Sequence, residues 1–375
     1  MKKSLVALAA LAASSAFAQF SIDGIWDIGY AAIDYKGAAK VSGINGNGSS
    51  TSQINLRGKE NLGGGLSADF RYETDWTTYN NRGNTGTVSN SVTAGNGGGA
   101  ASNVNLSSWG NGEIRGGIAG GFGRLDAGNV NSAQLTALLV GQPLGTAIGS
   151  SFRGQIVNDT SGLNSVRFEN SLRYTSPSLS GISATIYNVT KQTKAGTGVA
   201  GDEQFNNGFG LYDRMGVNEY SVNYNNGPIN ATYAVTKQDY ASVGANTFTT
   251  QLKSLGANYD VGNGFKVFAF NQKRTKSDGS VNRNFTLLTG QYTMGAHVVS
   301  VGTGSGTENG SGRTNSGESK LTSLAYDYNL SKMTAIYVRN ESIKDDGNWA
   351  ANSGVLPTAT NSTRQRTAVG LRIGF

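Results

Sequence analysis

Segments of about ten residues with alternating apolar and polar side chains recur along this chain to its last residue, and they restrict the possible fold more than any other feature. In the final segment one face holds Val369, Leu371, Ile373 and Phe375, and the other holds Arg372. Such two-residue periodicity is typical of a β-strand. After residue 18 no apolar run reaches the ~18 residues of a membrane helix. A membrane could therefore be crossed only by a closed barrel, which satisfies its own backbone hydrogen bonds.

Sixteen segments of this kind are joined alternately by short turns and long connections. They are Ser21–Tyr35, Ser52–Glu60, Leu66–Trp76, Gly110–Ala119, Arg124–Val130, Asn164–Ser176, Ile182–Val189, Gly216–Asn225, Ile229–Tyr240, Thr250–Asp260, Phe265–Thr275, Asn284–Thr293, Ala296–Gly304, Lys320–Leu330, Met333–Ile343 and Arg366–Phe375. An even number lets the first and last strands pair, and sixteen strands leave an aqueous lumen. The sequence predicts an all-β, 16-stranded antiparallel transmembrane β-barrel. A soluble sandwich or β-helix is disfavoured, because short turns and long loops alternate and no fixed repeat length is found.

The first 18 residues have the layout of a secretory signal peptide. Lys2 and Lys3 precede a short apolar stretch, and residues 16–18 (Ala-Phe-Ala) have the small-x-small pattern of a cleavage site. We expect cleavage after Ala18, so that residues 1–18 are the signal peptide and residues 19–375 form the barrel.

Charge and rare residue types exclude several classes of function. Cleavage lowers the 31 basic residues to 29, against 24 acidic residues, for a net charge of +5. The charges are interspersed, without the basic run that would indicate nucleic-acid binding. The chain has no cysteine and one histidine, His297, so it lacks a disulfide framework, a His-rich metal site and an evident Ser/His/Asp triad. We expect no enzyme, no cofactor and no bound metal.

Several motifs resemble the trimeric general porins of β-proteobacterial outer membranes. The most specific is residues 56–63 (Leu-Arg-Gly-Lys-Glu-Asn-Leu-Gly), and the others are residues 24–27 (Gly-Ile-Trp-Asp), 120–123 (Gly-Gly-Phe-Gly), 170–174 (Asn-Ser-Leu-Arg-Tyr) and the terminal Phe375. The resemblance implies a water-filled channel for passive diffusion of small hydrophilic solutes and ions, and a homotrimer with one pore per subunit. It also implies short periplasmic turns, long extracellular loops and a third loop folded inward. The partners it implies are outer-membrane lipid, lipopolysaccharide and the barrel-assembly machinery, which would recognise Phe375.

The third long connection, residues 131–163, is the candidate constriction. Its apolar residues 138–140 (Leu-Leu-Val) would be explained by packing against the inner wall. Strand alternation and the resemblance place four arginines near it, namely Arg57, Arg71, Arg115 and Arg153. Further residues expected to face the lumen are Lys59, Arg173, Arg339, Arg372 and, on the loop, Asp159, with the acids Asp69, Glu73, Glu113, Glu169 and Asp327 on the wall.

Basic rings favour anions, so we predict weak-to-moderate anion selectivity. Each arginine could instead pair with a neighbouring acid and only hold the wall. Two other functions remain open from the sequence. One is a substrate-specific channel in which tryptophans stack on sugars, and the chain has Trp26, Trp76, Trp109 and Trp349. The other is a surface adhesin that binds through its long loops.

Overall fold

The computed structural model describes residues 19–36, 40–75, 112–150, 166–189, 212–242, 247–310, 317–345 and 363–375. Within these ranges the strands are β1 (Gln19–Tyr35), β2 (Lys40–Asn45), β3 (Gln53–Gly63), β4 (Leu66–Asp75), β5 (Ile114–Gly120), β6 (Gly123–Asn131), β7 (Arg167–Thr175), β8 (Ile182–Val189), β9 (Tyr212–Asn226), β10 (Ile229–Ser242), β11 (Thr247–Gly262), β12 (Phe265–Lys276), β13 (Asn282–Met294), β14 (His297–Glu308), β15 (Gly317–Asn329), β16 (Thr334–Asp345) and β17 (Thr363–Gly374). The helix in these ranges is α2 (Ala133–Gly141).

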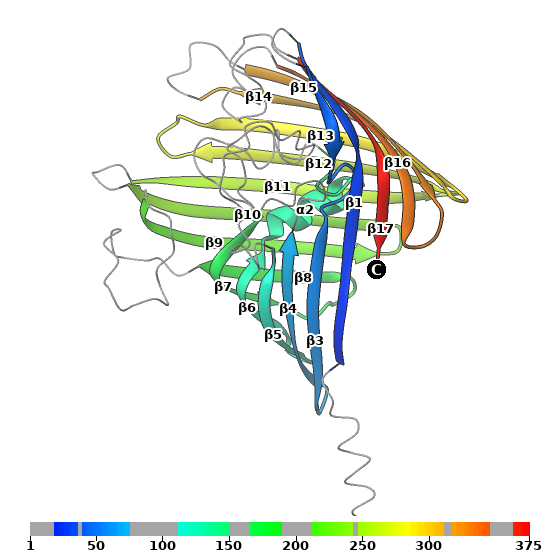
Figure 1. Ribbon diagram of the computed structural model, residues 1–375. Coiled ribbons are helices and arrows are strands. Elements are labelled where there is room, and N and C mark those ends of the chain that lie inside the picture. The colour runs from blue at the N-terminus through cyan, green and yellow to red at the C-terminus, as the bar shows by residue number, and fades with distance from the viewer. Residues whose placement is uncertain are drawn as a thin grey trace, which may run out of the picture.

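The strands form one closed antiparallel barrel (Figure 1). β1 pairs with β17. It also pairs with β3 along Gln19–Ile25 and with β2 along Gly29–Asp34. β2 and β3 therefore share one position in the wall, so the 17 strands make a 16-stranded barrel and confirm the predicted fold.

β2 lies in a stretch that the sequence predicts to be part of a long connection. This strand has six residues with Gly43 near its centre, and such a short run carries little alternation. Its pairing with the second half of β1 creates it. A strand gains its hydrogen bonds from its neighbour, so β2 forms because of a tertiary contact and not because of its local sequence.

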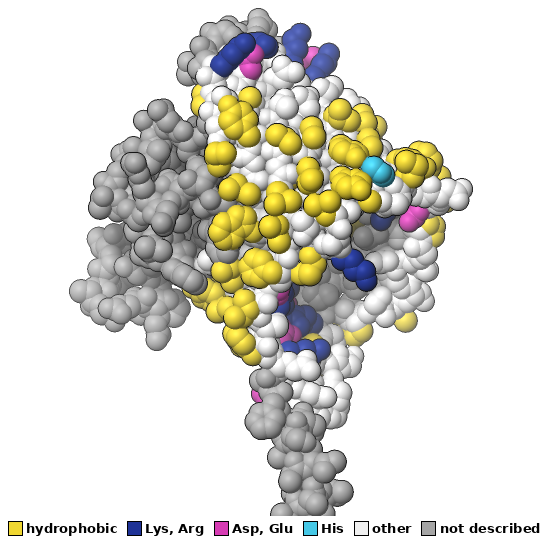
Figure 2. Space-filling view, turned by 45° about the vertical axis from the view of Figure 1, so that its right-hand side comes forward, with side chains coloured by type: hydrophobic (Ala, Val, Ile, Leu, Met, Phe, Trp, Pro, Cys, Tyr) yellow, Lys and Arg dark blue, Asp and Glu magenta, His cyan; other side chains and the backbone are white. Residues whose placement is uncertain are grey.

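The alternation places apolar side chains outside and polar ones inside. On β17, Val369 and Ile373 are exposed, as is Phe375 directly after the strand, whereas Arg364 and Arg366 are buried toward the lumen. This is the reverse of a soluble protein, and it suits a barrel surrounded by lipid. Apolar side chains are spread over the outer face in Figure 2, and basic and acidic side chains line the opening at the lower right.

Short turns connect consecutive strands at one end of the barrel, and aromatic side chains lie on the outer face near those turns. Glycine makes the β3–β4 turn possible, because Gly63, Gly64 and Gly65 have φ values of 81°, 59° and 81°. On the outer face, the rings of Phe265 and Tyr292 stack with centroids 4.2 Å apart. Such a girdle marks a membrane boundary.

The inner wall carries an apolar cluster where α2 is seated. The cluster joins Leu138 to Phe270, Phe285 and Leu287, which face inward from β12 and β13. Figure 1 shows α2 enclosed by the strands. Among the residues described, no helix has both the length and the hydropathy needed to span a membrane.

Candidate functional site at the constriction of the barrel

The chain turns inward after β6 and crosses the lumen as residues 132–150, here called the constriction segment. Ser132 caps α2, because its hydroxyl accepts a hydrogen bond from the Leu135 amide at 3.3 Å. Leu138 is buried against the wall, as predicted, but Leu139 is 46% exposed and faces the lumen. The inward fold of the third loop is confirmed for this segment, and the helix in it was not foreseen.

Polar side chains of the wall bind the ends of α2. Glu219 of β9 accepts a hydrogen bond from the Ala133 amide at 2.5 Å, at the helix N-terminus, where negative charge is favoured. Its other carboxylate oxygen accepts from the Thr236 hydroxyl at 2.6 Å. At the opposite end, the Asn258 amide donates to the Val140 carbonyl at 2.8 Å. These contacts fix the height of the helix in the barrel.

Two glycines bring α2 directly onto the strands. A Cβ on Gly256 of β11 would lie 2.6 Å from the Ala137 carbonyl carbon, and a Cβ on Gly141 would lie 2.7 Å from the Ala269 carbonyl oxygen. Both distances are shorter than van der Waals contact. The helix can lie this close to the wall only because both positions lack a side chain.

The far end of the constriction segment binds the opposite side of the barrel. The Gly149 amide donates to Glu341 of β16 at 2.9 Å. Glu341 in turn pairs with Arg364 at 2.9 Å and Arg366 at 2.6 Å. The Thr146 and Thr51 hydroxyls are 3.0 Å apart. The segment therefore spans the lumen and is attached on both sides.

A second element, the connection between β2 and β3, bends inward to meet it. Asp27 of β1 accepts hydrogen bonds from the amides of Gly48 at 3.2 Å and of Ser49 and Ser50 at 2.8 Å. The Tyr337 hydroxyl donates to the same carboxylate at 2.7 Å. A buried carboxylate with four donors holds this connection in place. The constriction is therefore bounded by two elements, the constriction segment and the β2–β3 connection, here called its two lips.

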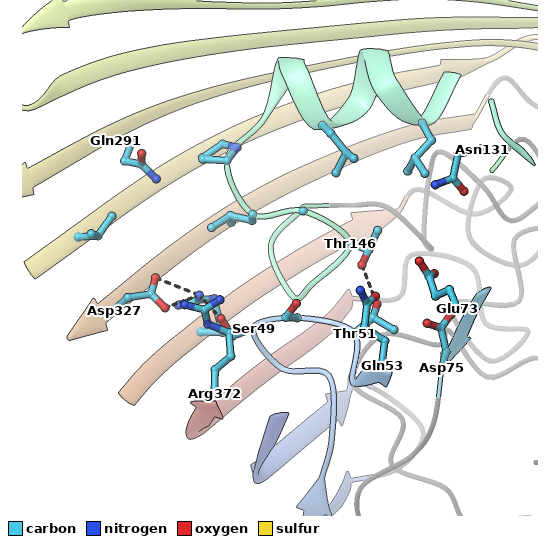
Figure 3. Close-up of a pocket in the computed structure, with 18 of the residues that line it drawn as sticks. Ser49, Thr51, Gln53, Glu73, Asp75, Asn131, Thr146, Gln291, Asp327 and Arg372 are labelled. Carbon is cyan, nitrogen blue, oxygen red and sulfur yellow. Dashed lines mark hydrogen bonds and ion pairs between the residues drawn. The ribbon is translucent and has the colours of Figure 1, made fainter. Parts of the chain in front are cut away.

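Between the two lips lies a cavity of about 510 Å³ (Figure 3). It is lined by Ser49, Ser50, Thr51, Gln53, Arg71, Glu73, Asp75, Asn131, Leu135, Leu139, Pro143, Leu144, Gly145, Thr146, Arg167, Gln291, Val298, Asp327, Asn329, Arg339 and Arg372. Figure 3 shows Asp327 and Arg372 at one end and Glu73 and Asp75 at the other. Most of the lining is polar, as an aqueous path requires.

The constriction segment contributes no charge to this cavity, because residues 132–150 contain no acidic or basic residue. The wall contributes four basic residues, Arg71, Arg167, Arg339 and Arg372, and three acidic ones, Glu73, Asp75 and Asp327. The lining therefore carries one excess positive charge.

Three of the four arginines predicted at the constriction form one row across adjacent strands. Arg71 of β4 lies directly opposite Arg57 of β3 and Arg115 of β5. Of the three, Arg71 lines the cavity. Arg153, with Asp159 of the same loop, lies outside the described residues.

Acids on neighbouring positions compensate this row. Arg57 pairs with Asp23 at 2.5 Å. Arg71 pairs with Glu73 and, at 2.9 Å, with Glu113. Arg115 pairs with Asp69 at 2.6 Å and with Asp126 at 3.1 Å. The alternative foreseen for each arginine, an ion pair along the wall, describes all three.

The further lumen residues divide into paired and unpaired groups. Arg173 pairs with Asp126 at 2.8 Å, and Arg339 with Asp327 at 2.7 Å. Lys59 and Arg372 make no ion pair with any described residue. Arg372 is therefore the cavity-lining arginine whose charge is not matched by a described carboxylate within 4 Å.

Sequence reasoning missed part of the site. Arg124 and Asp126 join the ion pairs of the wall, and Arg167 reaches the cavity from the first position of β7. These residues stand at lumen-facing positions of their strands, so the alternation of inward and outward side chains could have identified them. Asp27 and Glu219 act on loops distant in sequence, which no local pattern reveals.

Comparison with known proteins agrees with this geometry. The profile of the Gram-negative porin family matches residues 4–348. The chain is 31% identical over 352 residues to outer membrane porin protein 32 of Delftia acidovorans, covering 90% of this chain and 88% of that protein. The chain belongs to the Gram-negative porin family. This porin is also 28% identical over 428 residues to an outer membrane porin protein of Bordetella pertussis, covering 100% and 99% of the two chains.

Solved structures share the fold of this porin. The anion-selective porin from Comamonas acidovorans has a TM-score of 0.72 at 21% identity and covers 96% of this chain and 100% of its own. The in-vitro folded OmpT of Vibrio cholerae, in its trimer form, has a TM-score of 0.62 at 10% identity, with 96% and 99% covered. Together with the family match, they place the porin in the outer membrane.

His297 and Trp26, the histidine and the tryptophan among the described residues, lie on the outer face of the barrel and not in the lumen. His297 lies on the outer face, where its Nδ1 is 2.8 Å from the Tyr326 hydroxyl and its ring lies 5.0 Å from that of Tyr328. Trp26 is also outside and 44% exposed, while Trp76, Trp109 and Trp349 fall outside the described ranges. The matched relatives are porins, which are channels and not enzymes.

Proposed function

We propose that this porin passes small hydrophilic solutes and ions by passive diffusion with a weak anion preference, and that the cavity between the two lips sets that preference. The observation that carries the proposal is the charge of the cavity, where a neutral constriction segment faces a wall with one excess arginine. Arg372 supplies that excess. The anion-selective porin from Comamonas acidovorans, which shares the fold, supports the same direction.

We also propose that the signal peptide, residues 1–18, is removed on export and that the barrel assembles as a homotrimer. The trimer form of the matched OmpT supports the homotrimer. Phe375 suits an assembly signal, because it is 47% exposed on the outer face and its backbone pairs with Gly24 at the barrel seam. With periplasmic short turns, this signal would face the assembly machinery and the long loops would face outward.

The test is the reversal potential of the purified trimer in a planar bilayer under a KCl gradient. One charge at ~4 Å interacts with an ion by about 1 kcal/mol in water, equivalent to a factor of about 5 in local concentration. Screening lowers this value. We therefore expect an anion-sign potential for the wild type, a weaker one for Arg372→Gln and a cation-sign potential for Arg372→Glu.

Lys59→Gln is the matched control, because it removes one lumen charge from a residue that does not line the cavity. It should shift the potential less than Arg372→Gln does. A cation-sign potential for the wild type would overturn the anion preference and leave the channel. A folded, inserted protein without conductance would overturn the channel itself and favour the adhesin.

A further inference from the structure

The constriction segment exposes an apolar side chain to the cavity where the packing of the segment does not need one. Leu139 of α2 is 46% exposed and lines the cavity. Among the described residues, the apolar cluster that seats α2 on the wall contains Leu135 and Leu138 and not Leu139. A polar residue would fit an exposed helix position equally well, as Thr136 does about one turn earlier. Leu139 therefore offers apolar surface to whatever passes the constriction.

Two further apolar residues line the same cavity. Pro143 of the constriction segment is half-buried, and Val298 of β14 faces the lumen directly opposite Asp327 of β15. Figure 3 shows α2 along one side of the cavity and Arg372, with Ser49, along the other. The cavity thus combines an apolar surface with charged groups.

Arg372 is the charged group of this cavity that has donors available for a solute. Its guanidinium forms no ion pair and donates no hydrogen bond within the described part of the chain, whereas Arg71 and Arg339 are held by carboxylates. A guanidinium carries several N–H donors in one plane and binds a carboxylate through two parallel hydrogen bonds. A monatomic anion cannot make this paired contact.

We propose that Leu139 makes the constriction distinguish between anions of equal charge, and that it favours small organic monocarboxylates with an apolar body, such as aryl carboxylates. The carboxylate would bind Arg372. The ring would contact Leu139, Pro143 and Val298, which removes apolar surface of both partners from water. The cavity of about 510 Å³ has room for such a solute, because pockets for small organic molecules span ~300–1,000 Å³.

Other solutes and other uses of the leucine fit these residues less well. An inorganic anion gains only the contact with Arg372, and a neutral apolar solute gains only the contact with Leu139. An exposed leucine can also form a hydrophobic barrier that gates a channel by dewetting, but the lining of this cavity is mostly polar. The inference rests on the proposed function, since it requires that solutes pass through this cavity.

Block of the KCl current through single channels by added anions tests the proposal. The probes are benzoate and nicotinate, whose rings are nearly equal in size and which each carry one negative charge at neutral pH, while the ring nitrogen makes nicotinate more polar. We expect benzoate to have the lower half-blocking concentration by about threefold, the factor that roughly 30 Å² of additional apolar contact gives. Leu139→Asn nearly preserves the side-chain volume, and it should raise the half-blocking concentration of benzoate to that of nicotinate.

Three other variants separate the contacts. Val298→Thr is nearly isosteric and should reduce the difference between the two anions in part. Arg372→Gln should weaken the block by both anions by the same factor, because both carry the same carboxylate. Thr136→Ala is the matched control and should change neither value, since Thr136 is exposed on the same helix but is not part of the cavity lining.

Equal block of the wild type by the two anions would overturn the proposal. So would a preference for benzoate that survives both Leu139→Asn and Val298→Thr. The reversal potential of the same channels in a KCl gradient tests the proposed function separately. A cation-sign potential, together with a benzoate preference that Leu139→Asn removes, would overturn the anion preference of the pore and leave the role of Leu139. A folded, inserted protein without conductance would overturn both.

Discussion

The contact between α2 and the barrel wall at Gly256 gives the sharpest test of how the constriction is built. An alanine at this position would place its Cβ 2.6 Å from the Ala137 carbonyl carbon and 3.0 Å from the Gly141 amide nitrogen. Non-bonded carbons prefer ~3.5–4.0 Å, and the Ala137 carbonyl oxygen would lie closer to the new Cβ than the carbonyl carbon does. Gly256→Ala therefore requires the two backbones to separate by at least about 1 Å. β11 cannot yield easily, because β10 and β12 hold it along both edges. The helix must therefore move into the lumen.

This displacement changes both the channel and the stability of the barrel. Leu139, which α2 exposes to the cavity, would move with the helix and narrow the aqueous path. Overpacking of this kind typically costs about 1–3 kcal/mol. We expect lower single-channel conductance and a lower temperature of trimer dissociation on gels.

Gly116→Ala is the matched control. Gly116 lies within β5, and a Cβ there would meet no atom within 4 Å, so conductance should equal that of the wild type. A folded Gly256→Ala protein with unchanged or higher conductance would refute the reasoning, since it would mean that the helix does not lie against this strand.

Three further predictions follow from contacts of the site and of the outer face. Glu219→Ala leaves the buried Ala133 amide without its acceptor, at a cost of about 1–3 kcal/mol. Current recordings should then show more frequent transitions between conductance levels, and Glu219→Gln should be intermediate; wild-type noise in the alanine variant would argue against this anchor. Asp27→Ala leaves the Tyr337 hydroxyl and three backbone amides without their acceptor, at about 1–3 kcal/mol for each buried group. The variant should loosen the β2–β3 lip and raise single-channel conductance. An unchanged conductance would mean that this carboxylate does not hold the lip. His297→Ala should leave conductance and selectivity unchanged, because the ring lies on the outer face; a changed reversal potential would contradict that placement.

The sequence by itself determined the barrel and the direction of its side chains. Strand alternation is a local property, because successive side chains must point to opposite faces, so the inward Arg71 and the outward Val369 could be assigned without knowledge of their neighbours. The signal peptide, whose residues lie outside the described ranges, stays a prediction.

Only the tertiary structure decided what the lumen charges do. Arg57, Arg71 and Arg115 predicted a basic face, but their ion pairs form with acids on neighbouring strands, and the register that sets those distances is not a local property. The α2 helix depends on Glu219, which binds the Ala133 amide 86 residues away in the chain. The β2–β3 lip depends on Asp27, which binds the Ser49 amide 22 residues away. Local sequence fixes on which face a side chain lies, whereas the closure of the barrel decides which charge or carbonyl it meets.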